Sequence, residues 1–172
     1  MDLTLLKKAR KKDSEAFISI IEENKSYLYR VAYSILKNDA DAADAIQDTI
    51  LSCWKNIDKL HNLSYFKTWL TRICINCCKQ IIRKNQNIVY VDSYDGVESA
   101  EESNFFSKLC FQGIGETYKT ILTLRYSCGF SIKEISEMLN MKENTVKTRL
   151  SRGREAYKKL YLSEQGEALC KK

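Results

Sequence analysis

Residues 131–154, SIKEISEMLNMKENTVKTRLSRGR, constrain the fold of this chain most, because they encode two helices joined by a tight turn. Ser131, followed three residues later by Glu134, predicts a capping box at the start of the first helix. Asn140 tolerates the left-handed backbone that the turn requires. The apolar residues of the first helix share one face: Ile132, Ile135, Met138 and Leu139.

The second helix of this stretch is predicted to be basic, with Val146 and Leu150 facing inward. Its other positions are polar: Asn144, Thr145, Lys147, Thr148, Arg149, Arg152 and Arg154. This is the helix-turn-helix arrangement, whose second helix enters the major groove of DNA. A helical hairpin with a solvated charged face is the alternative interpretation. Basic charge and motif spacing coincide here, which favours DNA binding.

The composition allows long helices and suits a polyanionic partner. None of the 172 residues is proline, so long uninterrupted helices are allowed. The formal charge of +6 suits nucleic acid. Seven cysteines, an odd number, together with the lack of an export signal or membrane span, indicate reduced thiols and a cytoplasmic location.

The first half of the chain predicts several helices. We expect them at about residues 3–10, at 14–24, from about 28 to 37, and from the capping cluster at 38–41 onward. The last of these has an acidic face: Asp41, Asp44 and Asp48, with Gln47 beside them. Taken alone, this face is better explained as solvated surface.

A longer helix is expected over residues 65–84. Its apolar residues fall in one arc: Phe66, Leu70, Ile73, Cys77 and Ile81. The opposite arc is polar and basic: Thr68, Arg72, Asn76, Lys79 and Arg83. Such a strip suits a nucleic-acid backbone, because cationic side chains neutralise phosphates and release counterions. An ordinary amphipathic helix would show the same pattern.

Periodicity is lost from residue 85 to about residue 100, where acidic, Ser and Gly residues accumulate around an apolar segment at 88–91. A helical pattern resumes near Glu102. Gly113 and Gly115 precede a further helix from Glu116 to about Tyr126. Gly129 ends the connection between that helix and the helix-turn-helix. Fraying is expected after Leu162.

The chain resembles the extracytoplasmic-function (ECF) class of bacterial RNA polymerase sigma factors over about residues 3–160. DAADAIQDTILSCW resembles the core-polymerase-binding segment of that family, and FKTWLTRICINCCKQIIRK resembles its promoter-melting helix. TVKTRLSRGR resembles its −35-reading region. The resemblance implies an all-α fold: a sigma-2 domain at 1–84, a flexible linker at 85–101, a sigma-4 domain at 102–162 and a tail at 163–172.

The resemblance also implies roles for individual residues. The surface that docks on the clamp helices of the polymerase β′ subunit would comprise Asp41, Asp44, Gln47 and Asp48. A base turned out of the −10 element would meet Asn62, Tyr65 and Trp69, although Trp69 equally fits a core position. The backbone and the duplex edge there would be held by Thr68, Arg72, Asn76, Lys79 and Arg83.

In the sigma-4 domain, the resemblance implies that bases or groove edges of the −35 element meet Asn144, Thr145, Thr148 and Arg149. Phosphates would meet Lys147, Arg152 and Arg154. An apolar groove for the polymerase β flap would use Leu122, Leu124 and Ile135, which core packing explains equally well. One departure from the family is Gly153, where alanine is frequent; glycine costs up to about 1 kcal/mol in a helix interior.

The implied partners are core RNA polymerase, promoter DNA and an anti-sigma factor, commonly membrane-anchored, and the implied regulon responds to envelope stress. We expect no catalytic residue, metal, cofactor or small-molecule substrate, and therefore no enzyme. A zinc or redox sensor built on Cys74, Cys77 and Cys78 is the main alternative, but buried thiols in a core explain this spacing better. A repressor or activator with a sensing domain is the other alternative.

Overall fold

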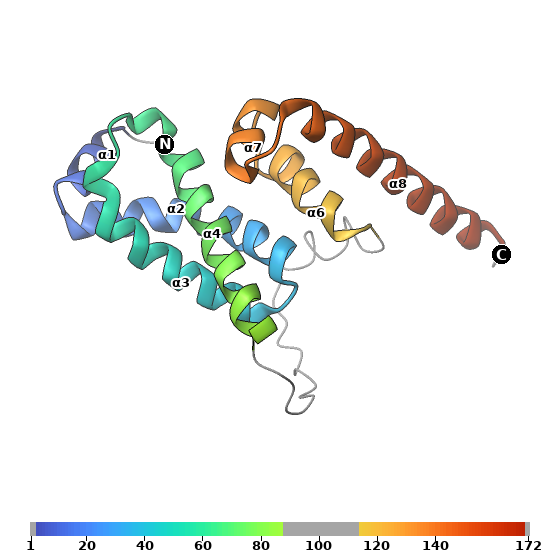
Figure 1. The fold of residues 1–172 in the computed structure, drawn as a ribbon, viewed down its shortest axis with the longest axis horizontal. Helices are drawn as coiled ribbons and strands as arrows, with labels where there is room; N and C mark the ends of the chain where they lie inside the picture. Colours follow the sequence, from blue (N-terminus) through green and yellow to red (C-terminus); the bar gives the residue numbers. More distant parts are fainter. Residues whose placement is uncertain (1–2, 88–113, 171–172) are drawn as a thin grey trace. The chain divides into compact units, whose positions relative to one another are not determined.

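The computed structural model describes residues 3–87 and 114–170, and every element in these ranges is helical (Figure 1). The chain divides into two compact units, residues 1–100 and 101–172, and each is described by itself. The apolar segment expected at 88–91 and the helix expected near Glu102 lie outside the described residues. The prediction of an all-α fold is confirmed.

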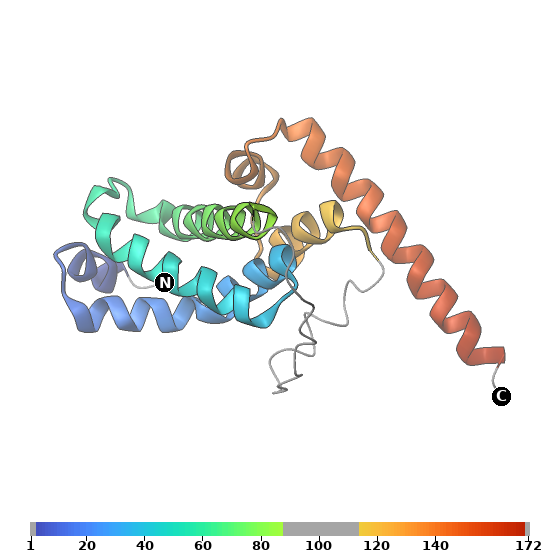
Figure 2. The ribbon, with the colours of Figure 1, turned by 60° about the horizontal axis from the view of Figure 1, so that its bottom comes forward.

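Within residues 3–87, the first unit has four helices: α1 (Leu3–Arg10), α2 (Ser14–Leu36), α3 (Asp39–Asn56) and α4 (Phe66–Asn87). Two short 3-10 turns, η1 (Ile57–Lys59) and η2 (Leu63–Tyr65), connect α3 to α4. Helices α2, α3 and α4 all pack on one another, and α1 packs on α2 and on both turns. Figure 2 shows α2, α3 and α4 stacked along their lengths. Each helix therefore buries one face and leaves another exposed.

The structure corrects the prediction of two separate helices at 14–24 and 28–37. Helix α2 runs without interruption over 23 residues, from the cap at Asp13 to Lys37, which has a left-handed backbone. Asn24, which suggests a break in the sequence, is buried and donates its side-chain amide to the Ile20 carbonyl at 2.6 Å. A polar residue satisfied within its own helix does not interrupt that helix.

The buried face of α4 is broader than the periodicity predicts. Phe66, Leu70 and Cys77 are buried as expected, but Ile73 and Ile81 are only half-buried. Other residues are buried in addition: Thr71, Cys74, Ile75 and Cys78. The reason is that α4 packs against both α2 and α3, so two neighbours, rather than one, cover its inner side.

The second unit contains α6 (Glu116–Leu122), a π-helical turn η4 (Thr123–Ser127), α7 (Ile132–Leu139) and α8 (Glu143–Cys170). Helix α8 packs on both α6 and α7. It continues as far as Cys170, past Leu162, where fraying was expected. Gly129 has φ 77°, a backbone conformation that side chains disfavour, and it separates η4 from α7.

The turn chemistry predicted for residues 131–154 is confirmed. The Glu134 backbone N–H donates to Ser131 Oγ at 3.2 Å, and the Ser131 backbone N–H donates to Glu134 Oε2 at 2.8 Å. Asn140 has φ 54° and ψ 51°, the left-handed conformation that ends α7. Val146 and Leu150 are buried, as predicted. The capping box and the left-handed Asn140 therefore set where α7 begins and ends.

Gly153 has a packing role that its helix propensity does not reveal. A β-carbon at this position would lie 3.1 Å from Leu122 Cδ1 and 3.2 Å from Tyr118 Cβ. Leu122 is buried, and the Tyr118 Cβ is attached directly to the backbone of α6, so neither atom moves freely. Glycine here lets α8 approach α6 closely.

Replacing Gly153 with leucine separates packing from propensity. Leucine is a better helix former than glycine by about 0.8 kcal/mol, so propensity alone predicts a more stable protein. The contact with α6 predicts a loss of about 1–3 kcal/mol from overpacking. We expect urea unfolding to show the loss, while Lys158→Leu, at an exposed position of α8, changes stability by less than about 0.5 kcal/mol. A stabilised Gly153→Leu protein would contradict this role.

Candidate functional site

The outward face of α3 carries three exposed polar side chains: Asp44, Gln47 and Asp48. Asn38 sets their register, because its side chain accepts the Asp41 backbone N–H at 3.0 Å and caps the helix. Within residues 3–87, neither Asp44 nor Asp48 forms an ion pair with a basic side chain. The face therefore presents uncompensated negative charge to solvent.

Asp41 differs from the other three residues predicted on this face. It is half-buried, and its Oδ2 accepts a hydrogen bond from Asn85 Nδ2 at 3.4 Å. Asn85 lies near the end of α4, so this bond joins the start of α3 to the end of α4. Asp41 is thus tied to its neighbour, whereas Asp44, Gln47 and Asp48 face outward.

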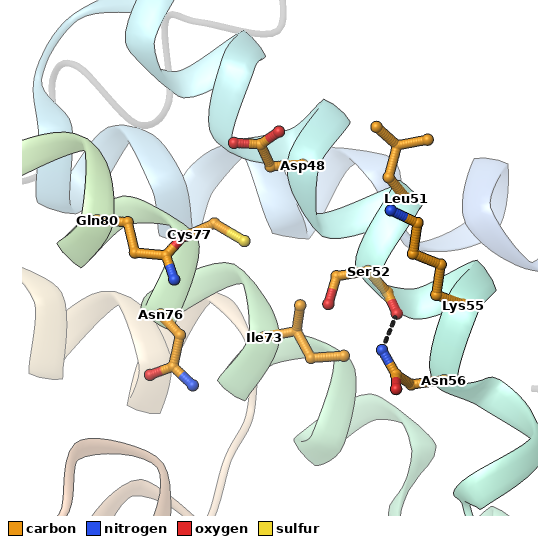
Figure 3. A pocket seen from close by; sticks show the side chains of 9 residues that line it. All are labelled: Asp48, Leu51, Ser52, Lys55, Asn56, Ile73, Asn76, Cys77 and Gln80. Atoms are coloured by element: carbon orange, nitrogen blue, oxygen red, sulfur yellow. Dashed lines mark hydrogen bonds between the residues drawn. The ribbon is translucent and has the colours of Figure 1, made fainter. Parts of the chain in front are cut away.

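A groove of about 470 Å³ lies between α3 and α4 (Figure 3). Helix α3 lines it with Asp48, Leu51, Ser52, Lys55 and Asn56. Helix α4 lines it with Ile73, Asn76, Cys77 and Gln80. Two residues that the sequence assigned to different surfaces, Asp48 and Asn76, therefore border the same groove.

Leu51 belongs to this site although sequence analysis did not name it. Its side chain is 57% exposed on α3, one turn beyond Gln47 and Asp48. An apolar residue on an otherwise acidic, outward helical face is the signal that identifies it. Such an arrangement combines an apolar contact with charged neighbours, which is typical of surfaces that bind another protein.

Along α4, the basic strip predicted from the sequence faces solvent. Arg72, Asn76, Lys79 and Arg83 are exposed, and Thr68 is half-buried. Trp69 is also half-buried, with its ring centroid 6.2 Å from that of Phe66, a core residue. The strip continues over several turns of a single helix, which keeps its cationic groups in a fixed row.

The short turn before α4 holds the other two residues predicted for the −10 element. Asn62 is exposed, and its Oδ1 accepts the Ser64 backbone N–H at 3.0 Å, which caps η2. Tyr65 follows at the end of this turn and is 57% exposed. An exposed phenol ring on a capped turn provides a flat surface on which a base can stack.

On α8, most of the predicted contact residues are exposed: Asn144, Thr145, Lys147, Thr148, Arg152 and Arg154. Arg149 is half-buried, with its Nη1 3.3 Å from the Met141 sulfur in the turn. Thr148 Oγ1 donates to the Asn144 carbonyl at 2.9 Å. The first turns of α8 therefore present polar and basic groups opposite the buried Val146 and Leu150.

Comparisons with known proteins match both units to one family. The family Sigma-70 region 2 matches residues 20–88, and the family Sigma-70, region 4 matches residues 110–156. The ECF RNA polymerase sigma factor SigW of Bacillus subtilis (strain 168) is 32% identical over 175 residues, which cover 90% of this chain and 93% of SigW. The chain belongs to the ECF family of RNA polymerase sigma factors.

A second relative agrees with this assignment. The RNA polymerase sigma factor SigV of Bacillus subtilis (strain 168) is 29% identical over 140 residues, covering 78% of this chain and 84% of SigV. As a member of this family, the present chain acts in the initiation of transcription. Within its described residues, no helix combines the length and the apolar character needed to cross a membrane.

Two solved structures have the same fold. CnrH, in complex with the cytosolic domain of CnrY, matches with a TM-score of 0.67 at 19% identity, over 93% of this chain and 96% of CnrH. The sigma factor RpoE of Bartonella quintana, in complex with the anti-sigma factor NepR, matches with a TM-score of 0.63 at 23% identity. That match covers 83% of this chain and 96% of RpoE.

The apolar groove expected for the β flap is not formed by the residues predicted for it. Leu122, Leu124 and Ile135 are 2%, 0% and 0% exposed. They belong to the core where α6, η4, α7 and α8 meet. The periodicity was correct in placing them on inner faces, but their burial inside the sigma factor leaves no surface for a partner.

The three neighbouring thiols of α4, Cys74, Cys77 and Cys78, are buried and are free rather than in disulfides. Burial raises the pKa of Cys77, and burial also raises the pKa of Cys53 to about 12. A hydrogen bond to the Cys74 thiol, together with burial, raises the pKa of Cys78. In the part of the chain that the structure describes, no group of three or more His, Cys, Asp or Glu side chains is arranged to hold a metal ion.

These thiols should be unreactive in the folded sigma factor. Alkylation requires an accessible thiolate, and burial shields all of these thiols from the reagent. Burial also raises the pKa of Cys53 and of Cys77, whereas the hydrogen bond from Cys78 lowers the pKa of Cys74, so the protection of Cys74 rests on burial alone. We expect iodoacetamide at pH 8, followed by peptide mapping, to leave five positions unmodified in native protein: Cys53, Cys74, Cys77, Cys78 and Cys128. All five should react after unfolding in urea. Rapid modification of Cys74, Cys77 or Cys78 in native protein would contradict their role as core residues.

Proposed function

We propose that this sigma factor binds core RNA polymerase through the outward face of α3 and reads two promoter elements. The turn at residues 61–65 and α4 take the separated −10 strand, while α8 takes the −35 duplex. One observation carries the proposal: the acidic face of α3 and the polar strip of α4 lie on adjacent helices of one unit, and Asp48 from the first and Asn76 from the second line the same groove (Figure 3). This brings a polymerase contact and a melted-DNA contact next to each other.

For the polymerase contact, Asp44, Gln47 and Asp48 supply exposed polar and anionic groups, and Leu51 supplies an apolar one. Asp41 supports the same surface through its bond to Asn85. Basic side chains on the clamp helices of the β′ subunit are the complementary partner. Such charge complementarity speeds encounter and sets register more than it adds affinity.

Reversing the charge of Asp48 tests the polymerase contact. Asp48 is exposed and, within residues 3–87, forms no ion pair, so Asp48→Lys should leave the fold intact. We expect at least about a tenfold loss in affinity for core polymerase, because a like-charge contact replaces an attractive one. Glu23→Lys makes the same charge change at an exposed position of α2 and should retain binding to core polymerase. If the two variants bound core equally well, α3 would not be the contact.

For the −10 element, we assign a different role to each part of the surface. Tyr65 stacks an unpaired base, and Asn62 reads its edge, because aromatic faces and amides suit these tasks. Trp69 offers the exposed part of its ring beside them. The phosphates are then held by Thr68, Arg72, Asn76, Lys79 and Arg83, since most protein–DNA contacts are to the backbone.

For the −35 element, the first turns of α8 enter the major groove. Asn144, Thr145 and Thr148 reach base edges, and Arg149 joins them from beside Met141. Three residues meet phosphates: Lys147, Arg152 and Arg154. The left-handed turn at Asn140 and the capping box of α7 define the helix that precedes α8 and so support the orientation of α8 relative to α7.

Substitutions of two arginines in α8 distinguish a residue that reads bases from a residue that contacts the DNA backbone. Arg152→Ala should weaken binding to every −35 sequence alike and reduce the salt slope by about one, because one phosphate contact is lost. Arg149→Ala should also relax sequence preference, at a cost of about 1–3 kcal/mol on the preferred site. Binding of wild type and both variants to a panel of −35 duplexes at several salt concentrations measures both effects. Identical specificity profiles for the two variants would contradict the assignment.

Transcription with purified components tests the whole proposal. Core polymerase plus this sigma factor should give run-off transcripts from a promoter with both elements, whereas core alone should not. A repressor or activator with a helix-turn-helix would bind duplex DNA but would not form a stable complex with core. Pull-down of core by the sigma factor therefore separates the two functions.

We further propose that the sigma factor acts in the cytoplasm, is itself no enzyme, and is held inactive by a membrane-anchored anti-sigma factor until envelope stress releases it. The two structures similar in fold support the partner, since RpoE is in complex with the anti-sigma factor NepR and CnrH with the cytosolic domain of CnrY. The exposed groove between α3 and α4 is the surface that such a partner would cover.

A further inference from the structure

Helix α1 and the turn that follows it concentrate positive charge that the proposed function does not use. Five of the six residues at positions 7–12 are basic: Lys7, Lys8, Arg10, Lys11 and Lys12. Ala9, the exception, and Leu6 are both 0% exposed, because they pack α1 on the unit. All five basic residues are exposed. The helix is thus fixed by its apolar side and presents its cations to solvent.

One of these cations is already engaged. The Lys12 ammonium donates to the Trp54 carbonyl at the end of α3, and lies 3.6 Å from Asp58 Oδ1 and 5.2 Å from the Trp54 ring centroid. It therefore anchors the corner between α1 and α2, and it also neutralises Asp58. The nearest carboxylate along the chain, Asp13, caps α2 by accepting the Ala16 backbone N–H at 3.0 Å.

The other four basic residues form what we call the α1 patch: Lys7, Lys8, Arg10 and Lys11. Within residues 3–87, its three lysines form no ion pair. Four like charges within five consecutive residues repel one another, and the approach of an anion relieves this repulsion. The α1 patch therefore has the charge that attracts a polyanion.

The position of the α1 patch identifies that polyanion. Helix α1 packs on η1 and η2, the turns that lead into α4, and Figures 1 and 2 both show it beside them. Arg10 Nη1 points at the Leu60 carbonyl, 3.5 Å away. The exposed Tyr65 follows a few residues later, at the start of α4. The α1 patch thus lies at the end of the unit where α4 begins, next to the turn that carries Tyr65.

We propose that the α1 patch binds the phosphates of the DNA strand that continues beyond the −10 element. This inference rests on the proposed function, in which the phosphates of the separated strand lie along α4 and an unpaired base stacks on Tyr65. A strand leaving Tyr65 in the same direction meets α1, which spans about 12 Å and so reaches a few nucleotides. The contact carries charge but no base recognition.

Two DNA probes and two matched variants test this contact with the full holoenzyme. Each probe is a duplex followed by a single-stranded −10 sequence, selected from a randomised pool by wild-type holoenzyme, and neither contains a −35 duplex. One probe ends at the last selected nucleotide, and the other continues with an oligothymidine extension of about eight nucleotides. The variant is Lys7→Gln/Lys8→Gln/Lys11→Gln, which leaves the Arg10 bond in place.

The matched control removes the same charge elsewhere: Lys25→Gln/Lys158→Gln/Lys159→Gln, all at exposed positions. We expect wild type and control to bind the extended probe more tightly than the short one. The affinity of the α1 variant should fall about tenfold for the extended probe and little for the short one. The slope of its log affinity against log salt concentration should also be smaller by about two, because each phosphate contact on a single strand contributes about 0.7 to that slope.

Several outcomes would overturn the inference. An equal loss on both probes would mean that α1 acts through the −10 site, and no loss on either would mean that it touches no DNA. Weaker binding of the variant to core polymerase, measured without DNA, would make the α1 patch a protein contact. Failure of the proposed function is distinguishable, because wild-type holoenzyme would then bind neither probe.

Discussion

The packing of α4 against α2 and α3 together is the interaction on which the first unit depends. It buries Phe66, Leu70 and Cys74 completely, and burial of such side chains contributes about 1.5–3 kcal/mol each for the larger apolar ones. Because α4 is covered by two helices, its remaining surface is a narrow polar row. The same packing sets α3 beside α4, so that the acidic face of α3 borders the groove opposite Asn76.

This geometry couples the stability of the unit to its proposed interactions. Two polar contacts join the helices near their ends: Asp41 with Asn85 between α3 and α4, and Lys12 with the end of α3. The middle of each outward face is left without such ties. Residues such as Asp44, Asp48 and Lys79 are therefore exposed on rigid helices, and a partner that binds them need not first break an internal bond.

The second unit depends on turn chemistry as well as on its core. Ser131 and Glu134 satisfy the backbone at the start of α7, and Asn140 reverses the chain at its end, so both ends of α7 are determined locally. Gly153 then allows α8 to lie close to α6. A small unit with few core residues gains rigidity from such contacts, and a helix that reads DNA requires that rigidity to keep its docking angle.

Much of this protein was determined by its sequence alone. The capping box, the turn at Asn140, the buried Val146 and Leu150, and the exposed strip on α4 all follow from local spacing, because neighbours on one helical face are fixed by a period of 3.6 residues. Membership of the ECF sigma family also follows from two motif blocks in the right order. Helical periodicity also predicts that Asp44, Gln47 and Asp48 lie on one surface.

Only the tertiary structure decided what each face packs against. Asn24 does not interrupt α2 because its amide is satisfied internally, and Ile73 borders a groove because α2 and α3 cover other parts of α4. Leu122, Leu124 and Ile135 are core rather than a docking surface, and Gly153 is a close contact rather than a flaw. Helical periodicity identifies residues that share a face, but the width of the buried face depends on how many neighbours cover it, and those neighbours are distant in the sequence.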